Sequence, residues 1–458
     1  MPRASTQNAR PALRRLPTRP SRMVQAVVSR LLPLLFRSQG LELSHRDAAE
    51  ALAKAFAAQQ SGGCNLLIAF RHPSTRDPVV MADLFWNGIP RAARRLKLQL
   101  PRPIQLRFLY DRGIPIWAGP VIGWLLQRSG GIAIHRGRLD RPALAQARGA
   151  LAQGRYPLVV APEGATNNLS GEMAPLEPGV AQLAFWAAED LEKANDERPL
   201  VVLPIGIHYS WRHPNWIALE ARLACLERHL GISSPDAGPD NPETTSRDRL
   251  IQIGMNLLKA LEQLERLKPD PAQTFSERID AYRRHGLAKA ETHFGLRAVG
   301  NLQERCRRIE QAAWDRIYRE GVDQLPPLER SLADWEAREA DLQLTRMRLV
   351  EHFTSVSGHY ISDRANFDRF AEMLLLVEEA IGWIEDKHWK GQPSLGPQRV
   401  ELQLGRALPV RPRLSQYRSN RREAMQLFMQ DLEQALVALM PDASRATSTA
   451  VTTETGEL

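Results

Sequence analysis

Between about residues 60 and 210, short apolar runs alternate with stretches in which apolar residues recur every three or four positions. The first pattern is typical of buried strands and the second of helices that cover a sheet. This alternation predicts an α/β layer structure. The predicted strands are residues 65–70, 104–110, 131–135, 158–161 and 200–205, and the predicted helices are residues 47–60, 78–86, 142–153 and 178–193.

The alternation ends near Trp216, and from there to about residue 390 the spacing is helical. Apolar residues recur at three- and four-residue steps between Phe367 and Ile384, which predicts one amphipathic helix. The other helical stretches are residues 248–266, 277–292, 298–319 and 329–357, and residues 234–246 read as a loop. This region is therefore predicted to be all-α.

Strand character returns once, at Val400–Leu404. Apolar residues alternate there with Glu401 and Gln403, so one face of the strand is apolar. A lone strand cannot satisfy its backbone hydrogen-bonding groups. We therefore expect it to join the earlier sheet beside residues 200–205, with a helix over residues 425–439 as its cover.

The predicted fold class is α/β, a mixed sheet flanked by helices with a large all-α insertion before the last strand. The predicted parts are a basic, partly disordered arm at residues 1–40, an α/β domain at 41–216 plus 396–440, the helical insertion at 217–395 and a disordered tail at 441–458.

The basic charge of the chain is concentrated at its start. The net charge is +9, and residues 1–37 hold eight arginines and no acidic residue. Within them, residues 23–37 are apolar with two arginines, which fits a helix in the interface of an anionic membrane. A helix packed on the core and a transit peptide are the alternatives. The arm lacks the aromatic residues that stack on bases, so nucleic-acid binding is not expected.

Two classes of protein are excluded by composition. The longest uncharged apolar stretch, Gly113–Leu126, is shorter than the roughly 18–20 residues of a membrane-spanning helix. Cys64, Cys225 and Cys306 have no paired spacing, which excludes a disulfide framework and a cysteine-rich zinc site. We expect a cytoplasmic protein without a metal, peripheral to a membrane, and the sequence indicates no oligomeric state.

His72 and Asp77 are the first candidate chemical pair. His72 follows a predicted strand in the segment FRHPSTRDP. Pro73 and Pro78 disrupt a continuous helix, which would hold the two side chains apart. A looped geometry can then bring the carboxylate to the imidazole, where it fixes the tautomer and supports the protonated ring. The alternative is that Asp77 only caps a helix and His72 is an ordinary loop residue.

Three further segments carry candidate binding residues. Arg136 ends the strand GIAIHR, where its guanidinium can bind a phosphate with two hydrogen bonds; a solvated basic turn is the alternative. Glu163 and Gly164 follow the strand LVVA, with Thr166 close behind; the alternative is that Glu163 is only a surface residue. Pro204 lies inside the strand VVLPIGI, which suggests an edge or a bulge near a site.

The order of these segments resembles the four sequence blocks of the glycerolipid acyltransferase family, which includes glycerol-3-phosphate and lysophosphatidic acid acyltransferases. HPSTRDP is similar to the first block, GIAIHR to the second, APEGATN to the third and VLPIGI to the fourth. The resemblance covers about residues 60–210, and VELQLGRALPV with the closing helix resembles the end of that domain. Each block alone is weak, whereas four in order are a strong signal.

The resemblance implies transfer of a fatty acyl group from acyl-CoA or acyl carrier protein to a hydroxyl of a glycerophosphate-type acceptor in phospholipid synthesis. His72 would be the general base and Asp77 would orient it. Arg136 would hold the acceptor phosphate. The remaining substrate-binding residues would be Glu163, Gly164, Thr166 and Pro204. No metal or organic cofactor is implied, because the acyl thioester is a co-substrate.

Two departures from the family pattern bear on this interpretation. The third block commonly reads Glu-Gly-Thr-Arg-Ser, and here the arginine is absent, so the phosphate contact shifts to Arg136, with Arg138 or Arg155 as helpers. Arg76 is an uncommon residue inside the first block. A non-catalytic lipid-binding relative, or one that acts on another lysolipid, is the alternative function; the presence of both His72 and Asp77 argues against the non-catalytic one.

Overall fold

The computed structural model describes residues 7–13, 15–135, 140–232, 242–353, 359–362, 366–385 and 391–440. They fall into two compact units. The sheet domain comprises residues 15–135, 140–212 and 397–440, and the helical domain comprises residues 7–13 and the described part of 213–396.

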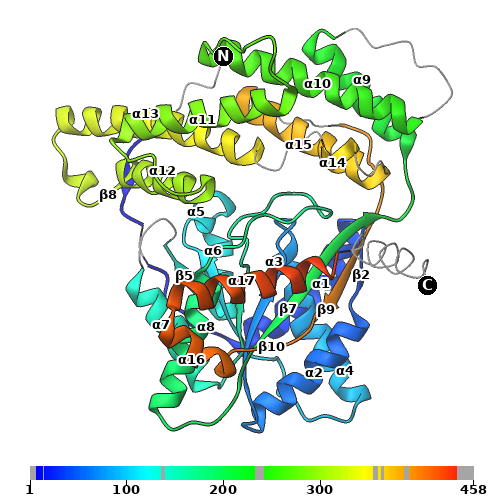
Figure 1. Ribbon diagram of the computed structural model, residues 1–458, viewed down its shortest axis with the longest axis vertical. Helices are drawn as coiled ribbons and strands as arrows, with labels where there is room; N and C mark the ends of the chain where they lie inside the picture. Colours follow the sequence, from blue (N-terminus) through cyan, green and yellow to red (C-terminus); the bar gives the residue numbers. More distant parts are fainter. Residues whose placement is uncertain are drawn as a thin grey trace, which may run out of the picture. The chain divides into compact units, whose positions relative to one another are not determined.

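The sheet domain is built on a mixed sheet in the strand order β2-β9-β7-β3-β6-β4-β5 (Figure 1). Strands β7, β3, β6, β4 and β5 run parallel, whereas β9 is antiparallel to β7 and parallel to β2. The short β10 also pairs with β7. The strands are β2 (Leu41–Ser44), β3 (Asn65–Phe70), β4 (Arg107–Asp111), β5 (Gly131–Ile134), β6 (Leu158–Val160), β7 (Leu200–Trp211), β9 (Gln398–Leu404) and β10 (Leu408–Pro409).

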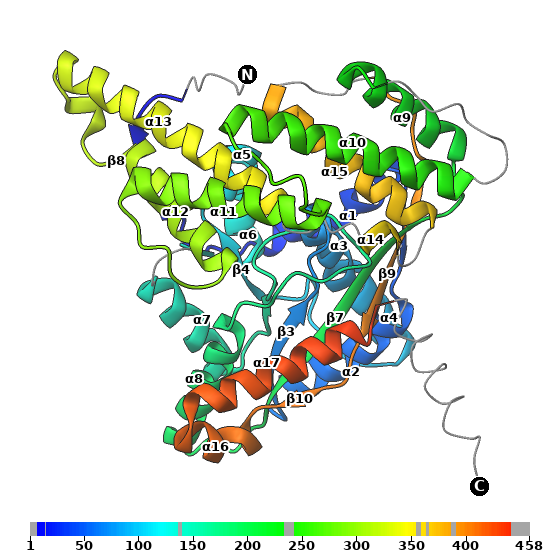
Figure 2. The ribbon, with the colours of Figure 1, turned by 45° about the horizontal axis from the view of Figure 1, so that its top comes forward.

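Helices cover both faces of this sheet, and each face has its own apolar core. On one face lie α1 (Arg22–Ser38), α2 (Arg46–Gln60), α3 (Asp77–Asp83), the π-helical turn η1 (Leu84–Gly88) and α4 (Ile89–Arg95). On the other lie α7 (Arg141–Gln153), α8 (Gly179–Lys193), α16 (Leu414–Ser419) and α17 (Arg421–Val437) (Figure 2). The turn η4 (Arg411–Arg413) precedes α16, and α5 (Ile114–Ala118) and α6 (Pro120–Ser129) follow β4.

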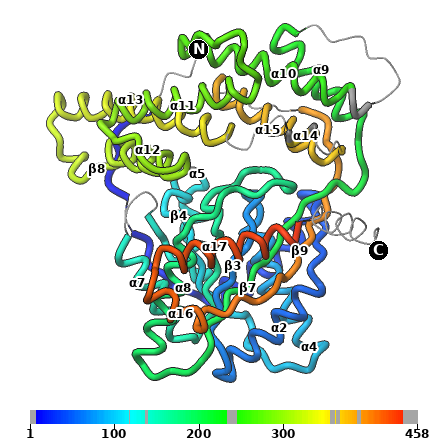
Figure 3. The backbone as a smooth tube through the Cα atoms, viewed as in Figure 1, coloured from blue at the N-terminus to red at the C-terminus, as the bar shows by residue number. Residues whose placement is uncertain are grey.

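The predicted strand Val400–Leu404 joins the sheet next to β7 as predicted, but it lies beside residues 205–211 rather than residues 200–205, because β7 extends to Trp211 and β10 pairs with its first half. β9 pairs with β7 over seven residue pairs from Ile205–Leu404 to Trp211–Gln398. Helix α17 places Phe428 and Leu432 in the apolar core on the face of the sheet that α7, α8 and α16 also cover. The chain therefore leaves the sheet after β7 and returns to it through β9, a path that can be followed in Figure 3. The α/β class with a helical insertion before the last strand is confirmed.

The helical domain contains α9 (Trp216–Leu230), α10 (Pro242–Glu265), α11 (Phe275–Phe294), α12 (Leu302–Ile317), α13 (Pro327–His352), α14 (His359–Ser362) and α15 (Phe367–Glu385), with the short turn η2 (Val322–Gln324) between α12 and α13. Local chemistry defines its helix ends. Thr274 with Glu277 and Asn301 with Glu304 form capping boxes at the starts of α11 and α12. Gly295 closes α11 with a φ of 65°, the left-handed conformation that glycine adopts at little cost.

Three expectations need correction. The predicted loop at 234–246 ends earlier, because α10 begins at Pro242, a residue favoured in a first helical turn; residues 233–241 lie outside the described part. The insertion is not purely α, because β8 (Tyr318–Arg319) pairs with β1 (Arg10–Pro11). That pairing also corrects the predicted disorder of the arm: the Ala9 amide donates to Asp334 Oδ1 at 2.9 Å, a partner too distant in sequence for local patterns to reveal.

Candidate active site

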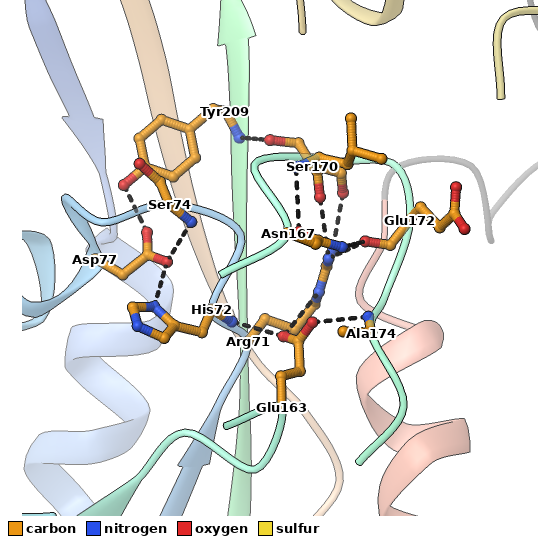
Figure 4. Close-up of polar contacts among 11 residues, drawn as sticks. Arg71, His72, Ser74, Asp77, Glu163, Asn167, Ser170, Glu172, Ala174 and Tyr209 are labelled. Carbon is orange, nitrogen blue, oxygen red and sulfur yellow. Dashed lines mark hydrogen bonds and ion pairs between the residues drawn. The ribbon is translucent and has the colours of Figure 1, made fainter. Parts of the chain in front are cut away.

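The candidate residues lie where parallel strands end. β3 continues from Phe70 into Arg71 and His72, and the neighbouring β6 continues into Glu163. Because carboxyl ends of adjacent parallel strands meet at one edge of a sheet, the loops after β3 and β6 come together there. Figure 4 shows the side chains of both loops converging at this edge.

His72 and Asp77 form a hydrogen-bonded pair. His72 Nδ1 lies 2.9 Å from Asp77 Oδ2, and the Asp77 side chain is fully buried whereas that of His72 is 18% exposed. Because the carboxylate accepts, Nδ1 carries the ring proton and Nε2 presents its lone pair. A histidine in this tautomer can take a proton at Nε2.

Asp77 is placed differently from a helix cap. Helix α3 begins at Asp77 itself with Pro78 in its first turn, and Arg76 precedes the helix. The carboxylate points back along the loop, where Oδ2 also accepts the Ser74 backbone N–H at 2.8 Å. Its other oxygen, Oδ1, accepts the Tyr209 hydroxyl at 2.6 Å. The described contacts of this carboxylate therefore orient His72.

Glu163 holds the backbone of His72. Its Oε1 accepts the His72 N–H at 2.6 Å and its Oε2 accepts the Ala174 N–H at 2.9 Å. The carboxylate is fully buried, and Arg71 Nε lies 3.8 Å from Oε1. Glu163 is predicted to line an acceptor site, but both of its carboxylate oxygens accept backbone N–H groups of the protein itself, which supports a positioning role.

Arg71 organises the loop that follows Glu163. Its guanidinium is almost fully buried and donates to the backbone carbonyls of Leu169, Ser170 and Glu172, at 2.7 Å for the two shortest bonds. Such charge-assisted hydrogen bonds are stronger than those between neutral groups. Asn167 adds a bond from Nδ2 to the Glu172 carbonyl at 2.6 Å. Arg71 thus fixes the loop after β6 against the loop after β3.

The remaining predicted residues take different positions. Gly164 has a φ of +71°, the left-handed region that favours glycine, and a Cβ there would lie 2.2 Å from Glu177 Oε1, so that side chain would have to move. Thr166 is half-buried in the same loop. Pro204 is buried in β7 opposite Ala69, at the point where the partner strand changes from β9 to β10. This break, rather than a sheet edge, accommodates its missing N–H.

The predicted phosphate-binding arginines are only partly located. Arg136 and Arg138 lie outside the described residues. Arg155 is excluded as a helper, because it precedes β6 and its guanidinium lies 5.3 Å from the Tyr156 ring, at the amino end of the strand. His72 lies at the carboxyl end, and a strand of three residues spans about 10 Å.

Two residues that contribute to the site lie outside the four sequence blocks, so the blocks do not predict them. Tyr209 lies on β7 beyond the fourth block, and Gln398 begins β9, where its Oε1 accepts from Arg76 Nη2 at 2.6 Å. Both side chains contact the loop of the first block from far away in sequence. The predicted strands, residues 200–205 and Val400–Leu404, stop short of both residues, and only their predicted pairing indicated this part of the sheet.

The comparisons with known proteins agree with this geometry. Residues 49–208 match the family model described as Acyltransferase, which spans the region from α2 to β7 and contains His72, Asp77 and Glu163. The chain therefore contains a domain of the acyltransferase family, and the predicted resemblance is confirmed. No curated protein and no solved structure matches the chain.

Neither a metal site nor a membrane span is evident in the described part of the chain. No group of three or more histidine, cysteine or acidic side chains is placed to hold a metal ion there. None of its helices combines the length and the apolar character needed to cross a bilayer.

Proposed function

We propose that this protein transfers a fatty acyl group directly from an acyl thioester to a hydroxyl of a glycerophosphate-type acceptor. The observation that carries the proposal is the His72–Asp77 pair, whose 2.9 Å hydrogen bond leaves Nε2 as the basic ring nitrogen. The donor would be acyl-CoA or acyl carrier protein, and the acceptor glycerol 3-phosphate or lysophosphatidic acid. The family match supports acyl transfer as the class of reaction.

In the proposed reaction, His72 Nε2 takes the proton of the acceptor hydroxyl as the oxygen attacks the thioester carbonyl. The new C–O bond forms, the C–S bond breaks, and the leaving thiolate takes the proton back from the imidazolium. Asp77 stabilises that imidazolium through Nδ1. General acid–base catalysis of this kind contributes roughly 10²–10⁴-fold in rate.

The acceptor is tested by comparing substrates. Acyl-CoA and acyl carrier protein are each offered with glycerol 3-phosphate, lysophosphatidic acid or an uncharged monoacylglycerol, and the ester product is measured. The proposal expects ester with at least one phosphorylated acceptor and far less with monoacylglycerol. Ester formation with monoacylglycerol alone would contradict a glycerophosphate acceptor.

Arg136 is proposed to bind the acceptor phosphate, because it belongs to the segment GIAIHR that is similar to the second sequence block; β5, which ends at Ile134, runs parallel to β3, the strand that leads to His72. Replacing Arg136 with alanine is expected to raise the acceptor KM at least tenfold, since a hydrogen bond to a charged group is worth roughly 1.5–3 kcal/mol. The donor KM should change little. Steady-state kinetics with each substrate varied in turn measures both, and an equal rise in the two KM values would contradict the assignment.

We also propose that the protein works at the surface of an anionic membrane, through one surface of the sheet domain. On α1, Met23, Val27, Leu31 and Leu34 are 78%, 49%, 54% and 60% exposed and recur at helical spacing. The opposite side of α1 places Leu32 and Phe36 in the core. Helix α6 packs beside α1 and adds exposed Val121, Ile122 and Trp124. We call these seven exposed residues the α1–α6 surface.

Charge and position favour a lipid bilayer as the partner of this surface. Arg22, Arg30 and Arg37 on α1 are exposed, and no acidic residue precedes Glu42. Each arginine near an anionic membrane contributes about 1 kcal/mol of attraction, which salt screens. Helix α1 also packs on α3, the helix that begins at Asp77. A membrane bound there would offer lipid substrates near the candidate site.

Binding through this surface is tested by substitutions rather than by deletion, since Leu32 and Phe36 belong to the core. The variant Leu31→Glu/Leu34→Glu/Trp124→Glu is expected to lose at least tenfold in binding to vesicles that contain anionic lipid, because each buried apolar side chain contributes about 1.5–3 kcal/mol. Co-sedimentation at low salt measures this binding.

The matched control is Leu328→Glu/Leu332→Glu/Trp335→Glu, on the exposed side of α13, where these side chains are 82%, 55% and 58% exposed. It should pellet with vesicles like the parent protein. Equal pelleting of both variants, or an equal loss in both, would contradict the assignment of the membrane contact to the α1–α6 surface.

A further inference from the structure

We infer that Tyr209 is a positioning residue for the proposed reaction, acting through the carboxylate of Asp77. The inference rests on the proposed function of His72 and adds a residue that lies outside the four sequence blocks. Tyr209 donates its hydroxyl to Asp77 Oδ1 at 2.6 Å, from a strand 132 residues away in sequence. Figure 4 shows the phenol and the imidazole on the two oxygens of the same carboxylate.

The sheet register explains why Tyr209 reaches this position. Ile205 of β7 pairs with Phe70, the last residue of β3, so β7 continues past the end of its neighbour. Among the described strands, the extension pairs with β9 alone, where Tyr209 lies opposite Val400. Tyr209 is thereby carried to the level of the loop between His72 and Asp77. If β7 ended level with β3, none of its residues would reach this position.

Tyr209 acts as a permanent hydrogen-bond donor. Its ring is buried, and burial together with the negative charge of Asp77 raises the pKa of the phenol well above its usual value. The hydroxyl therefore keeps its proton wherever the enzyme is active. A neutral phenol can donate to Oδ1 throughout the reaction without taking up the charge that develops on His72.

The tyrosine itself is fixed on two sides. Its backbone N–H donates to Ser170 Oγ at 3.2 Å, and the Arg76 guanidinium lies 5.0 Å from the centre of its ring. Arg76 is in turn bound to Gln398 Oε1 on β9. The uncommon arginine of the first block thus stacks on the ring that orients Asp77, and the strand after the helical insertion holds that arginine.

The arrangement accounts for the orientation of the catalytic pair. Asp77 Oδ2 accepts from His72 and from the Ser74 amide, and Tyr209 occupies Oδ1. With both oxygens held, the carboxylate cannot rotate, and Oδ2 stays on Nδ1 of His72. Without Tyr209, Oδ1 is a buried charged oxygen that lacks this donor, and the carboxylate is free to turn towards other donors.

The substitution Tyr209→Phe removes only this hydroxyl. We expect kcat to fall roughly ten- to hundredfold, the range that one hydrogen bond to a charged group supports, while the KM of each substrate stays within about twofold because no substrate contact is lost. In an Asp77→Asn background the same substitution should cost no more than about twofold, since its target carboxylate is gone.

Tyr110→Phe is the matched control. Tyr110 is also a buried tyrosine of the sheet domain, and its hydroxyl has no hydrogen-bond partner among the described residues. Burial raises its pKa to about 12, so this phenol is neutral as well. Tyr110→Phe should keep kcat near that of the parent, which separates the loss of the Asp77 bond from the loss of a buried hydroxyl.

A spectroscopic readout makes the inference independent of turnover. The proton between His72 Nδ1 and Asp77 should give a low-field ¹H NMR signal that His72→Ala abolishes. Tyr209→Phe should shift or broaden this signal, whereas Tyr110→Phe should leave it unchanged. A parent protein that shows the signal and transfers no acyl group to any acceptor would refute the proposed function and leave the positioning intact.

Two results would overturn the role of Tyr209. The first is a Tyr209→Phe variant with the kcat and the low-field signal of Tyr110→Phe. The second is a loss of kcat of the same size in the parent and Asp77→Asn backgrounds, which would show that Tyr209 acts on the fold rather than on the carboxylate. The inference is supported if Tyr209→Phe lowers kcat in the parent protein but not in the Asp77→Asn background, and also changes the low-field signal.

Discussion

His72→Ala is expected to remove nearly all acyl transfer, with a fall in kcat of roughly 10²–10⁴-fold. The substitution removes the nitrogen that takes the hydroxyl proton, and no other histidine in the described part of the chain is hydrogen-bonded to Asp77. The fold should survive, because the side chain is 18% exposed and lies in a loop. Steady-state kinetics and a thermal unfolding curve measure the two effects separately.

Asp77→Asn is the companion variant for this prediction. An asparagine amide that donates to Nδ1 would place the ring proton on Nε2 and remove its basic lone pair. A fall in kcat approaching that of His72→Ala is therefore expected. If His72→Ala retained the parental rate, the assignment of the general base would be wrong.

A fragment of residues 1–216 is expected to be insoluble or inactive, although it contains all four sequence blocks. It lacks β9, which pairs with residues 205–211 of β7, and so exposes the backbone hydrogen-bonding groups along that edge of the strand. It also loses nine large buried apolar side chains: Val400, Leu402, Leu408, Val410, Leu414, Tyr417, Phe428, Leu432 and Leu436. At about 1.5–3 kcal/mol each, these match or exceed the roughly 5–15 kcal/mol of a typical domain's stability.

Co-expression of residues 397–440 is the control for this fragment. Supplying β9, β10 and α17 in trans should restore some soluble protein if their absence is the cause. Solubility after centrifugation and acyl transfer by the soluble fraction are the measurements. A 1–216 fragment that is soluble and active alone would show that the returning strand and helix are dispensable.

The elements of the fold could be predicted where the pattern was regular. The strand over residues 65–70 and the helices over 47–60 and 142–153 lie within one residue of their predicted limits. The return of Val400–Leu404 to the sheet followed from an unpaired strand with one apolar face. The pairing of β1 with β8 could not be predicted, since two-residue strands carry no periodicity.

The site was predictable only in part, for a similar reason. His72 and Asp77 are five residues apart, so sequence order and two prolines were enough to bring them together. Tyr209 and Gln398 reach the same loop from 132 and 322 residues away from their partners. Their contacts depend on the register of β7 against β3 and β9, which the sequence does not reveal. Burial of Glu163 was hidden for the same reason, because its donors belong to two different loops.

The central claim is that thioester cleavage and ester formation are one event that requires His72. The most direct measurement follows both products in one sample, the released thiol by a colorimetric reagent and the new ester by mass spectrometry, for the parent protein and for His72→Ala. The expected result is one ester formed for each thiol released by the parent, with both products reduced at least about a hundredfold in the variant. Thiol release without ester, or equal product from both proteins, would contradict it.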